Sequence, residues 1–565
     1  MVARMMLRSW LVAALVACSA PAAAPPGLGP RTISIIGTND LHGALIRLPL
    51  LAGYIANVRA ARARDGGVLL VDAGDLFQGT LESNLAEGAD VIRAYNAMGY
   101  NASAIGNHEF DFGPVGPAVT VKAAGEDPRG ALKARIGEAH FPFLVTNIAD
   151  DATGKAIDWP NTAPGTMVEI AGVRIGLIGA STEHTPSTTM PANFAGLHML
   201  PTARMIAGEA MALRGAGAQV IVVIAHLGSE CKDLDHPDDV STCDQSEEVF
   251  HVLAEVPKGL VDVFVAGHTH AAIAHRIDGV AVIESYSSGR AFGRIDLVVD
   301  RGKIVSTTID KPQLICPLDA YQNPIPVADC HPAPYEGRPV VADAAIQHIV
   351  DDSLARARER SDEKLGVTLA GPITKTYKTE SQEGDLVTDL MREARPEADV
   401  AMTNGGGLRA DLPPGELTYG ALFQAMPFDN RFSLISLTGV QLRELVADNL
   451  TRAGSILSWS GLQATARCVA GSIDLDIAIN GKPLDDATTY KVVTSDFLAS
   501  GGDGLLADTK LAPDAVQPTD VIIREAVANV LRARKGTTVD PAAFATKRLV
   551  YPGVRPVSCH EGDAP

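Results

Sequence analysis

The sequence predicts an α/β protein of two domains joined by a helix, and three observations support this class. The chain has 565 residues, more than a single hydrophobic core usually organises. From Thr32 to about Asp300, short β-branched runs alternate with segments of helical periodicity, a pattern typical of layered α/β domains. A proline-bearing stretch from Ile315 to Arg338 then precedes a second region of strands and helices, Gly371 to about Tyr551.

The first region contains apolar runs of strand length and longer segments whose apolar residues recur at helical spacing. The predicted strands include Ile33 to Ile36, Val68 to Asp72, Val173 to Gly179, Val220 to Ala225 and Val261 to Val265. The predicted helices include Leu48 to Arg64, Thr202 to Arg214 and the connecting helix, Val340 to Leu365.

The N-terminus has the layout of an export signal. Arg4 and Arg8 precede an apolar run, Trp10 to Ala17, that is too short to span a bilayer. The run leads into Leu15-Val16-Ala17-Cys18, which resembles the lipobox of bacterial lipoproteins. We therefore expect a signal peptide over residues 1–18, lipidation of Cys18, a tether over residues 19–30 and, since Ser19 follows, an outer-membrane position. The alternative is cleavage after Ala22 to Ala24, which predicts an unanchored periplasmic protein.

Six further cysteines form an even set, which fits disulfide bonds in an oxidising compartment. Proximity in the sequence favours the pairs Cys231–Cys243 and Cys316–Cys330, which leaves Cys468 with Cys559. Six cysteines allow fifteen pairings, so the others stay open. No Cys-x-x-Cys spacing indicates a zinc site.

The formal net charge is −19, whereas nucleic-acid affinity rests on Lys and Arg side chains that neutralise phosphates. We therefore expect no nucleic-acid polymer as a partner, and any bound phosphate to belong to a small molecule. The sequence implies no protein partner.

Five predicted buried segments end in, or are followed by, residues of the types that bind metal ions. These residues are Asp40, His42, Asp75, Asn107, His226, His268 and His270. Because the carboxyl ends of strands in an open α/β sheet form one rim, these side chains should converge. Alternating residues of an extended segment face the same side, so we also expect His268 and His270 to point together. Imidazoles and carboxylates suit two divalent ions, and Zn²⁺ or Mn²⁺ is expected.

The series Asp40-x-His42, Gly74-Asp75, Gly106-Asn107-His108-Glu109-x-Asp111, His226 and Gly267-His268-x-His270 resembles the signature of calcineurin-like metallophosphoesterases. With the second region, nearly the whole mature chain is similar to the 5′-nucleotidase and UDP-sugar hydrolase family. The resemblance implies one metal on Asp40, His42, Asp75 and His270, and another on Asp75, Asn107, His226 and His268.

The resemblance also implies catalytic roles and a mechanism. His108 would stabilise the transition state, and Asp111 would orient His108. A protonated imidazole beside the metals can neutralise charge on the phosphoryl group or reach the leaving oxygen. The implied reaction is in-line attack by metal-bound hydroxide, with release of phosphate and nucleoside outside the cytoplasm.

The second region carries two motifs that resemble the substrate-binding segments of the family. Their candidate residues are Asn404, Gly405, Gly407 and Arg409 in the Gly-rich loop, Phe428, and Phe497 and Asp503 in the later segment. Two aromatic rings can stack on a base, a contact that contributes about 1–3 kcal/mol. Arg409 can pair with a phosphate oxygen.

One departure from the family pattern affects the expected substrate. Thr379 stands where these 5′-nucleotidases carry an arginine, and the neighbouring Lys378 lacks the bidentate fork. UDP-sugar or dinucleotide pyrophosphatase activity, or 2′,3′-cyclic phosphodiesterase with 3′-nucleotidase activity, therefore stays open. A binding protein without turnover and a sulfur-oxidation hydrolase of related fold are the remaining alternatives.

The predicted organisation follows from these observations. A metallophosphoesterase domain is expected over residues 31–337, a linker helix over 338–365 and a substrate-binding α/β domain over 366–555. The resemblance adds that the first domain has four layers, α/β/β/α.

Overall fold

The computed structural model describes residues 29–318, 325–506, 509, 511–512 and 514–560. The predicted signal peptide, the lipidation at Cys18 and nearly all of the predicted tether lie outside these residues. No helix of the described part of the chain combines the length and apolar character needed to cross a membrane.

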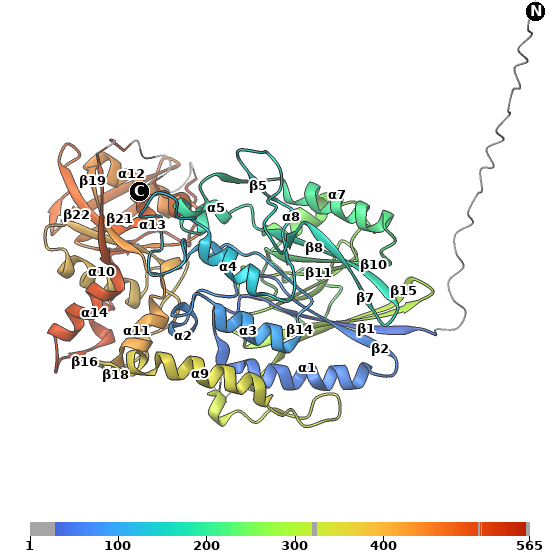
Figure 1. Ribbon diagram of the computed structural model, residues 1–565. Helices are drawn as coiled ribbons and strands as arrows, with labels where there is room; N and C mark the ends of the chain where they lie inside the picture. Colours follow the sequence, from blue (N-terminus) through green and yellow to red (C-terminus); the bar gives the residue numbers. More distant parts are fainter. Residues whose placement is uncertain (1–28, 319–324, 507–508, 510, 513, 561–565) are drawn as a thin grey trace, which may run out of the picture.

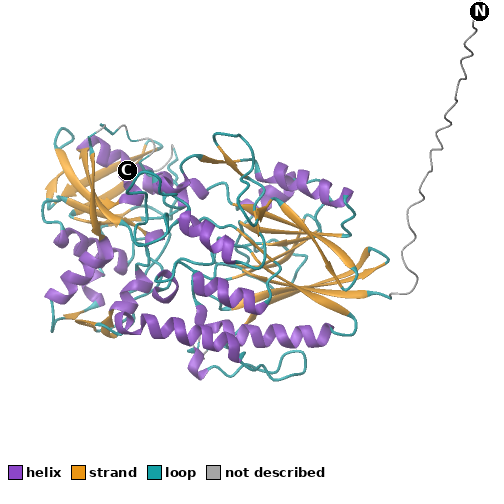
Figure 2. Cartoon of the chain, in the orientation of Figure 1, coloured by secondary structure: helices purple, strands orange, loops and turns teal. Residues whose placement is uncertain are grey.

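The N-terminal domain contains two mixed sheets that pack face to face (Figure 2). The first has the order β15 (Lys303–Leu314), β14 (Ala291–Asp300), β1 (Arg31–Thr38), β2 (Gly66–Asp72), β3 (Ala102–Ala104), β4 (Phe143–Leu144) and β6 (Thr162–Ala163). The second has the order β12 (Ala272–Ile277), β13 (Val280–Ser285), β11 (Val263–Val265), β10 (Val220–His226), β8 (Val173–Ser181) and β7 (Gly165–Ile170). Strands β5 (Ile148–Asp150) and β9 (Leu197–Met199) form a separate pair.

Helices cover the outer face of each sheet, which completes the four layers that the family resemblance implies. They are α1 (Leu48–Arg62), α3 (Ala89–Met98), α4 (Gly130–Glu138), α7 (Thr202–Gly215) and α8 (Glu248–Glu255), with short turns α2 (Leu81–Asn84), α5 (Thr185–Thr188) and α6 (Pro191–Phe194). Strand β1 shows the layering, since Ile33 and Ile35 pack between the sheets and Ile36 packs under the outer helices. This alternation follows from the two-residue period of a strand.

The C-terminal domain, coloured orange to red in Figure 1, has its own core of three sheets and five helices. The main sheet runs β20 (Leu457–Ser460), β17 (Val400–Asn404), β24 (Thr489–Ser495), β19 (Arg431–Thr438) and β25 (Val516–Ile522). The smaller sheets are β23 (Lys482–Pro483), β22 (Ser472–Ile479), β21 (Leu462–Val469) and β27 (Leu549–Val550), and β18 (Gly415–Thr418), β16 (Lys364–Leu369) and β26 (Thr538–Val539). The helices are α10 (Gln382–Ala394), α11 (Tyr419–Ala425), α12 (Gly439–Thr451), α13 (Asp496–Ala499) and α14 (Ile523–Ala533).

The connecting helix α9 (Ala344–Ser361) is shorter at both ends than the predicted span of Val340 to Leu365. Asp343 starts it, because this side chain accepts hydrogen bonds from the amides of Ala345 and Ile346. At the other end Leu365 belongs to β16. The start of α9 lies beside the start of α1, where the amide of Asp343 donates to the carbonyl of Pro49, and Figure 1 shows α9 running from there toward α11 of the other domain.

Three disulfide bonds lie among the described residues, Cys231–Cys243, Cys316–Cys330 and Cys468–Cys559. The first two are the pairs that proximity in the sequence favours, and the third is the pair that they leave. The third ties the C-terminal tail to β21.

Candidate active site

The predicted metal ligands converge at the carboxyl ends of strands from both sheets of the N-terminal domain. Asp40 and His42 follow β1, Asp75 follows β2, Asn107 follows β3, His226 ends β10, and His268 and His270 follow β11. Strands β1, β2 and β3 are parallel, as are β10 and β11, so these ends meet at one edge.

Two overlapping groups of ligand atoms result. In the first, His42 Nε2 lies 2.9 Å from His270 Nε2, and His270 Nε2 lies 3.3 Å from Asp40 Oδ1. In the second, His226 Nε2 lies 3.0 Å from both Asp75 Oδ2 and Asn107 Oδ1, and 3.3 Å from His268 Nδ1. Asp75 Oδ2 is also 3.8 Å from His42 Nε2, so Asp75 lies where a carboxylate shared by two ions would lie.

The chemistry of these donors fits divalent cations. Asp40 is fully buried, and its Oδ1 has no hydrogen-bond partner among the described residues. His42 Nδ1 lies 2.8 Å from the carbonyl of Gln78, and His226 Nδ1 lies 2.9 Å from the carbonyl of Ala73. These contacts favour protons on Nδ1 and leave the Nε2 lone pairs free for a metal.

Ionisation at the cluster agrees with this interpretation. Burial lowers the pKa of His268 to about 3, and it also lowers the pKa of His42 and His270, which keeps these imidazoles neutral. Burial opposes a charge on His226 as well, but Asp75 and Asp40 outweigh it and raise the pKa of His226 to about 10. The two carboxylates therefore attract positive charge to this point of the site.

The backbone is strained at the ligands. The φ angles of Asp40, His42, Asp75, His268 and His270 all lie between 50° and 81°, a region that residues other than glycine rarely adopt. The segment from His268 to His270 is therefore not extended, so the expected reason for the two side chains to point together is wrong, although both do point into the cluster. Each points into the cluster because its own residue is left-handed.

Two glycines let the chain pass close to Asp75. Gly74 has a φ of 95°, and a Cβ atom there would lie 2.7 Å from the amide nitrogen of Gly106. A Cβ atom on Gly106 would lie 2.2 Å from Asp75 Oδ1. Gly74 thus permits a tight turn that aims the Asp75 carboxylate at the cluster.

His108 lies beside the ligands and is held by two carboxylates, those of Asp111 and Asp75. Its Nδ1 is 2.6 Å from Asp111 Oδ2, and its amide donates to Asp75 Oδ1 at 2.8 Å. Thr189 Oγ1 fixes Asp111 from the other side at 2.9 Å. Burial disfavours the imidazolium, but Asp111 and Asp75 outweigh this and raise the pKa of His108. The arrangement can hold a proton on the face toward the metal cluster.

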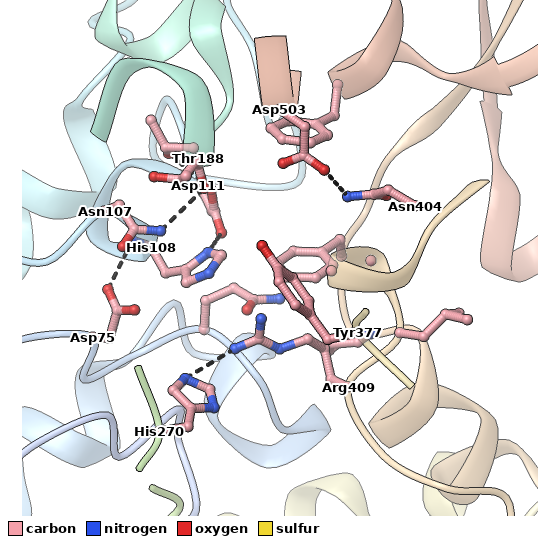
Figure 3. A pocket seen from close by; sticks show the side chains of 18 of the residues that line it. Asp75, Asn107, His108, Asp111, Thr188, His270, Tyr377, Asn404, Arg409 and Asp503 are labelled. Carbon is pink, nitrogen blue, oxygen red and sulfur yellow. Dashed lines mark hydrogen bonds and ion pairs between the residues drawn. The ribbon is translucent and has the colours of Figure 1, made fainter. Parts of the chain in front are cut away.

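The metal cluster borders a cavity of about 490 Å³ between the two domains. Every predicted substrate residue lines it, namely Asn404, Gly405, Gly407, Arg409, Phe428, Phe497 and Asp503. Asp75, Asn107, His108, Asp111, His268 and His270 line it from the other domain, whereas Asp40, His42 and His226 do not line it and are buried. In Figure 3, His108 and Asp75 lie on one side, and Asn404 and Asp503 lie on the other.

Contacts across the cavity already join the two domains. Arg409 Nη2 lies 3.2 Å from His42 Nε2. It also lies 3.3 Å from His270 Nε2, a contact that Figure 3 shows. The guanidinium therefore competes with a metal ion for the same lone pairs. The Phe428 ring lies 5.3 Å from the His108 ring. Within the C-terminal domain, Asn404 Nδ2 donates to Asp503 Oδ2 at 2.8 Å.

The sequence prediction missed several residues of the site. Lys375 and Tyr377 line the cavity, and Lys378, which we set aside as a substitute for the missing arginine, lines it too. No recognisable motif covers this segment, because it coincides with the departure from the family pattern. Glu109 had no predicted role, yet its carboxylate accepts from the amides of Asp75, Leu76 and Gly106. Its position inside the Asn-His-Glu motif was the available signal.

Relatives of known name share this organisation. The chain is 26% identical over 530 residues to cell wall protein Lmo0130 of Listeria monocytogenes, a match that covers 85% of this chain and 64% of the relative. It is also 26% identical over 522 residues to the trifunctional nucleotide phosphoesterase protein YfkN of Bacillus subtilis, covering 85% of this chain and 32% of the relative. The chain thus spans less than two thirds of either relative.

The fold resembles a solved structure, that of a 5′-nucleotidase precursor from Thermus thermophilus. The TM-score is 0.71 at 22% identity, and the match covers 92% of this chain and 99% of the other. The family of calcineurin-like phosphoesterases matches residues 33–272, and the C-terminal domain of 5′-nucleotidases matches residues 363–509. With these two domains in this order, the chain belongs to the 5′-nucleotidase family of calcineurin-like phosphoesterases.

Proposed function

We propose that this protein hydrolyses phosphate esters of nucleotides with two divalent metal ions and releases phosphate and a nucleoside. One observation carries the proposal: a single cavity is lined by His108 and part of the predicted metal-ligand cluster on one side and by Phe428, Phe497 and Asp503 on the other. The first set can perform phosphoryl chemistry, and the second can bind a nucleoside. The names of the relatives, a nucleotide phosphoesterase and a 5′-nucleotidase, agree with this pairing.

We assign the metal ligands as the family resemblance implies. Asp40, His42, Asp75 and His270 would hold one ion, and Asp75, Asn107, His226 and His268 the other, with Zn²⁺ or Mn²⁺ as the expected metals. Bound there, the ions supply an activated water and polarise the phosphoryl oxygens.

The remaining roles belong to side chains of this protein. His108, with Asp111 behind its Nδ1, presents a positive charge or a proton to the phosphoryl group and the leaving oxygen. Arg409, already at the cluster, would turn from the two imidazoles to a phosphate oxygen. The rings of Phe428 and Phe497 would flank the base, and Asp503 would accept hydrogen bonds from the nucleoside.

We further propose that the protein acts outside the cytoplasm and is tethered through a lipid on Cys18. The three disulfide bonds support export, because such bonds persist in oxidising compartments. Mass spectrometry of the mature N-terminus tests the tether. A diacylated Cys18 supports it, and an unmodified N-terminus after residues 22–24 contradicts it.

Activity is tested by phosphate release from the protein lacking residues 1–18. The substrates are AMP, UMP, 3′-AMP, UDP-glucose and a 2′,3′-cyclic nucleotide, each with Zn²⁺, Mn²⁺ or chelator, and a coupled phosphatase reveals pyrophosphate cleavage. His108→Ala should lose about 10²–10⁴-fold in kcat, the usual contribution of a positioned acid or base. The exposed His348 provides the matched control, His348→Ala.

Three outcomes separate the alternatives. Chelator-sensitive turnover of AMP or UMP that falls in His108→Ala supports the proposal. Turnover confined to UDP-glucose or to the cyclic nucleotide moves the protein to that activity. No turnover of any of these substrates by folded, metal-loaded protein contradicts nucleotide hydrolysis.

A further inference from the structure

Arg524 is a buried arginine in the first turn of α14, and every part of its guanidinium is engaged. Its side chain is 4% exposed, a degree of burial that arginine rarely reaches without partners. Nη1 donates to the carbonyls of Met426 at 3.0 Å and Phe428 at 3.2 Å, and Nη2 pairs with the carboxylate of Asp429. Nε donates to the hydroxyl of Tyr419 at 3.2 Å.

These acceptors surround one residue of the cavity wall, Phe428. The segment from Met426 to Asn430 is an irregular connection between α11 and β19, so no ladder of backbone hydrogen bonds fixes it. The amide of Ile523, next to Arg524, donates to the carbonyl of Asn430 at 2.9 Å. The start of α14 therefore holds this segment at both ends.

The guanidinium itself has little freedom to move. Its Cζ lies 4.0 Å from the centre of the Phe423 ring, a cation–π contact that fixes its plane. The Tyr419 hydroxyl that accepts from Nε donates in turn to Glu525. A rigid, planar donor with several fixed partners transmits its position to the loop that it holds.

The Phe428 ring lies near residues of both domains that line the cavity. Its ring lies 5.3 Å from the ring of His108, and the Arg409 guanidinium lies 5.8 Å from its centre. We propose that Arg524 is a positioning residue that sets the Phe428 ring for contact with the base of the substrate. This inference rests on the proposed nucleotide hydrolysis, and Arg524 itself does not line the cavity.

The test compares a nucleotide with its base-free counterpart. KM and kcat are measured for AMP and for ribose 5-phosphate with wild type, Arg524→Lys and the control Arg532→Lys. Lysine keeps the charge but cannot serve several acceptors in one plane. We expect Arg524→Lys to raise KM for AMP by about tenfold, within the range of a lost base-stacking contact, and to leave kinetics with ribose 5-phosphate unchanged. Arg532 lies on the same helix and pairs with Glu363. Arg532→Lys should therefore leave KM and kcat unchanged for both substrates.

A double-mutant cycle separates positioning from general damage. If Arg524 acts through Phe428, then Arg524→Lys should add little to the KM for AMP in a Phe428→Leu background. Equal losses with AMP and ribose 5-phosphate, or full additivity with Phe428→Leu, would overturn the inference. Should Arg524→Lys fail to fold, Asp429→Asn weakens the same anchor and should give a smaller change of the same kind.

A measurement that needs no turnover distinguishes failure of the inference from failure of the proposed function. Hydrogen exchange of the peptide covering residues 426–430 should be faster in Arg524→Lys than in wild type or Arg532→Lys. Unchanged exchange contradicts the positioning role whatever the enzyme hydrolyses. Faster exchange in a protein that hydrolyses no nucleotide would support the anchor and reject the proposed substrate.

Discussion

The two domains that meet at the cavity each bury a glutamate, and the two carboxylates differ in their hydrogen bonding. Glu109, 1% exposed, accepts hydrogen bonds from the amides of Asp75, Leu76 and Gly106 at 2.6 to 2.8 Å. Glu383, fully buried in α10, has no hydrogen-bond partner for either carboxylate oxygen among the described residues. Glu109 is thus fixed by satisfied hydrogen bonds on the metal side, whereas on the substrate side Glu383 stays unsatisfied and the Phe428 segment relies on the anchor Arg524.

This contrast predicts that damage on the metal side affects every substrate, with Asp75→Asn giving the largest loss. Residues that merely support metal ligands typically contribute about 10–100-fold, so loss of a shared ligand should cost more than about 100-fold in kcat. AMP and ribose 5-phosphate should suffer alike, and metal content measured by elemental analysis should fall below two ions per chain. A selective loss with AMP would contradict the division between the two sides.

Glu109→Gln should give the next largest effect. The substituted amide offers one acceptor oxygen to three amide donors, and its NH₂ group faces N–H groups that need an acceptor. We expect a loss of about 10–100-fold in kcat for both substrates, as for other residues that support metal ligands. Glu255→Gln, at the surface of α8, is the control. Wild-type kcat in Glu109→Gln would show that these hydrogen bonds are dispensable.

The same contrast explains what the sequence could predict. The metal side depends on short motifs at strand ends, so the periodicity of β1, β2 and β10 and the residues after them were enough to bring its members together. The left-handed backbone at His268 and His270 was not foreseeable, because only the packed site holds residues other than glycine in that conformation. Two disulfide pairs followed from proximity, and the third was the pair that these two left.

The substrate side depends on residues far apart in the sequence. Arg524 anchors Phe428 from 96 residues away, and Tyr377 enters the cavity from a segment without a motif. Long-range contacts of this kind leave no periodic signal. The end of the connecting helix was missed for a related reason, since pairing of β16 with β18 overrides the helical spacing around Leu365.

Phe497→Leu should impair nucleotides alone. Its ring packs on Gly502, where a Cβ atom would lie 2.5 Å from the ring, and it lines the cavity opposite the metal side. Loss of stacking, about 1–3 kcal/mol, predicts a rise in KM for AMP of roughly tenfold with little change for ribose 5-phosphate. Phe250→Leu, half-buried in α8, controls for the loss of a ring. Equal effects on both substrates would mean that the Phe497 ring packs in the core and does not stack on the base.

The ionisation of Asp503, on the substrate side, should make the KM for AMP depend on pH. Burial raises the pKa of its carboxyl to about 6, although the hydrogen bond from Asn404 opposes this. The ionised form accepts hydrogen bonds from the nucleoside, and at pH 5 only about one tenth of the chains would carry it. KM for AMP should therefore rise as pH falls through 6, by up to about tenfold at pH 5. Asp503→Asn should remove this dependence, and a profile that persists in the variant would assign it to another group.

Glu383→Gln should have the smallest effect on catalysis and a measurable effect on stability. Burial, reinforced by Asp411 and opposed by Lys375, raises the pKa of Glu383 to about 9. Between the ordinary value near 4.5 and 9, the folded protein keeps a proton that the unfolded chain releases, so stability falls as pH rises. Glutamine has no proton to lose. The Tm of Glu383→Gln relative to that of wild type should therefore rise as pH increases from 5 to 8. Glu444→Gln, exposed on α12, should follow wild type. Parallel curves for wild type and Glu383→Gln would mean that Glu383 has found a partner, and that it is as well satisfied as Glu109.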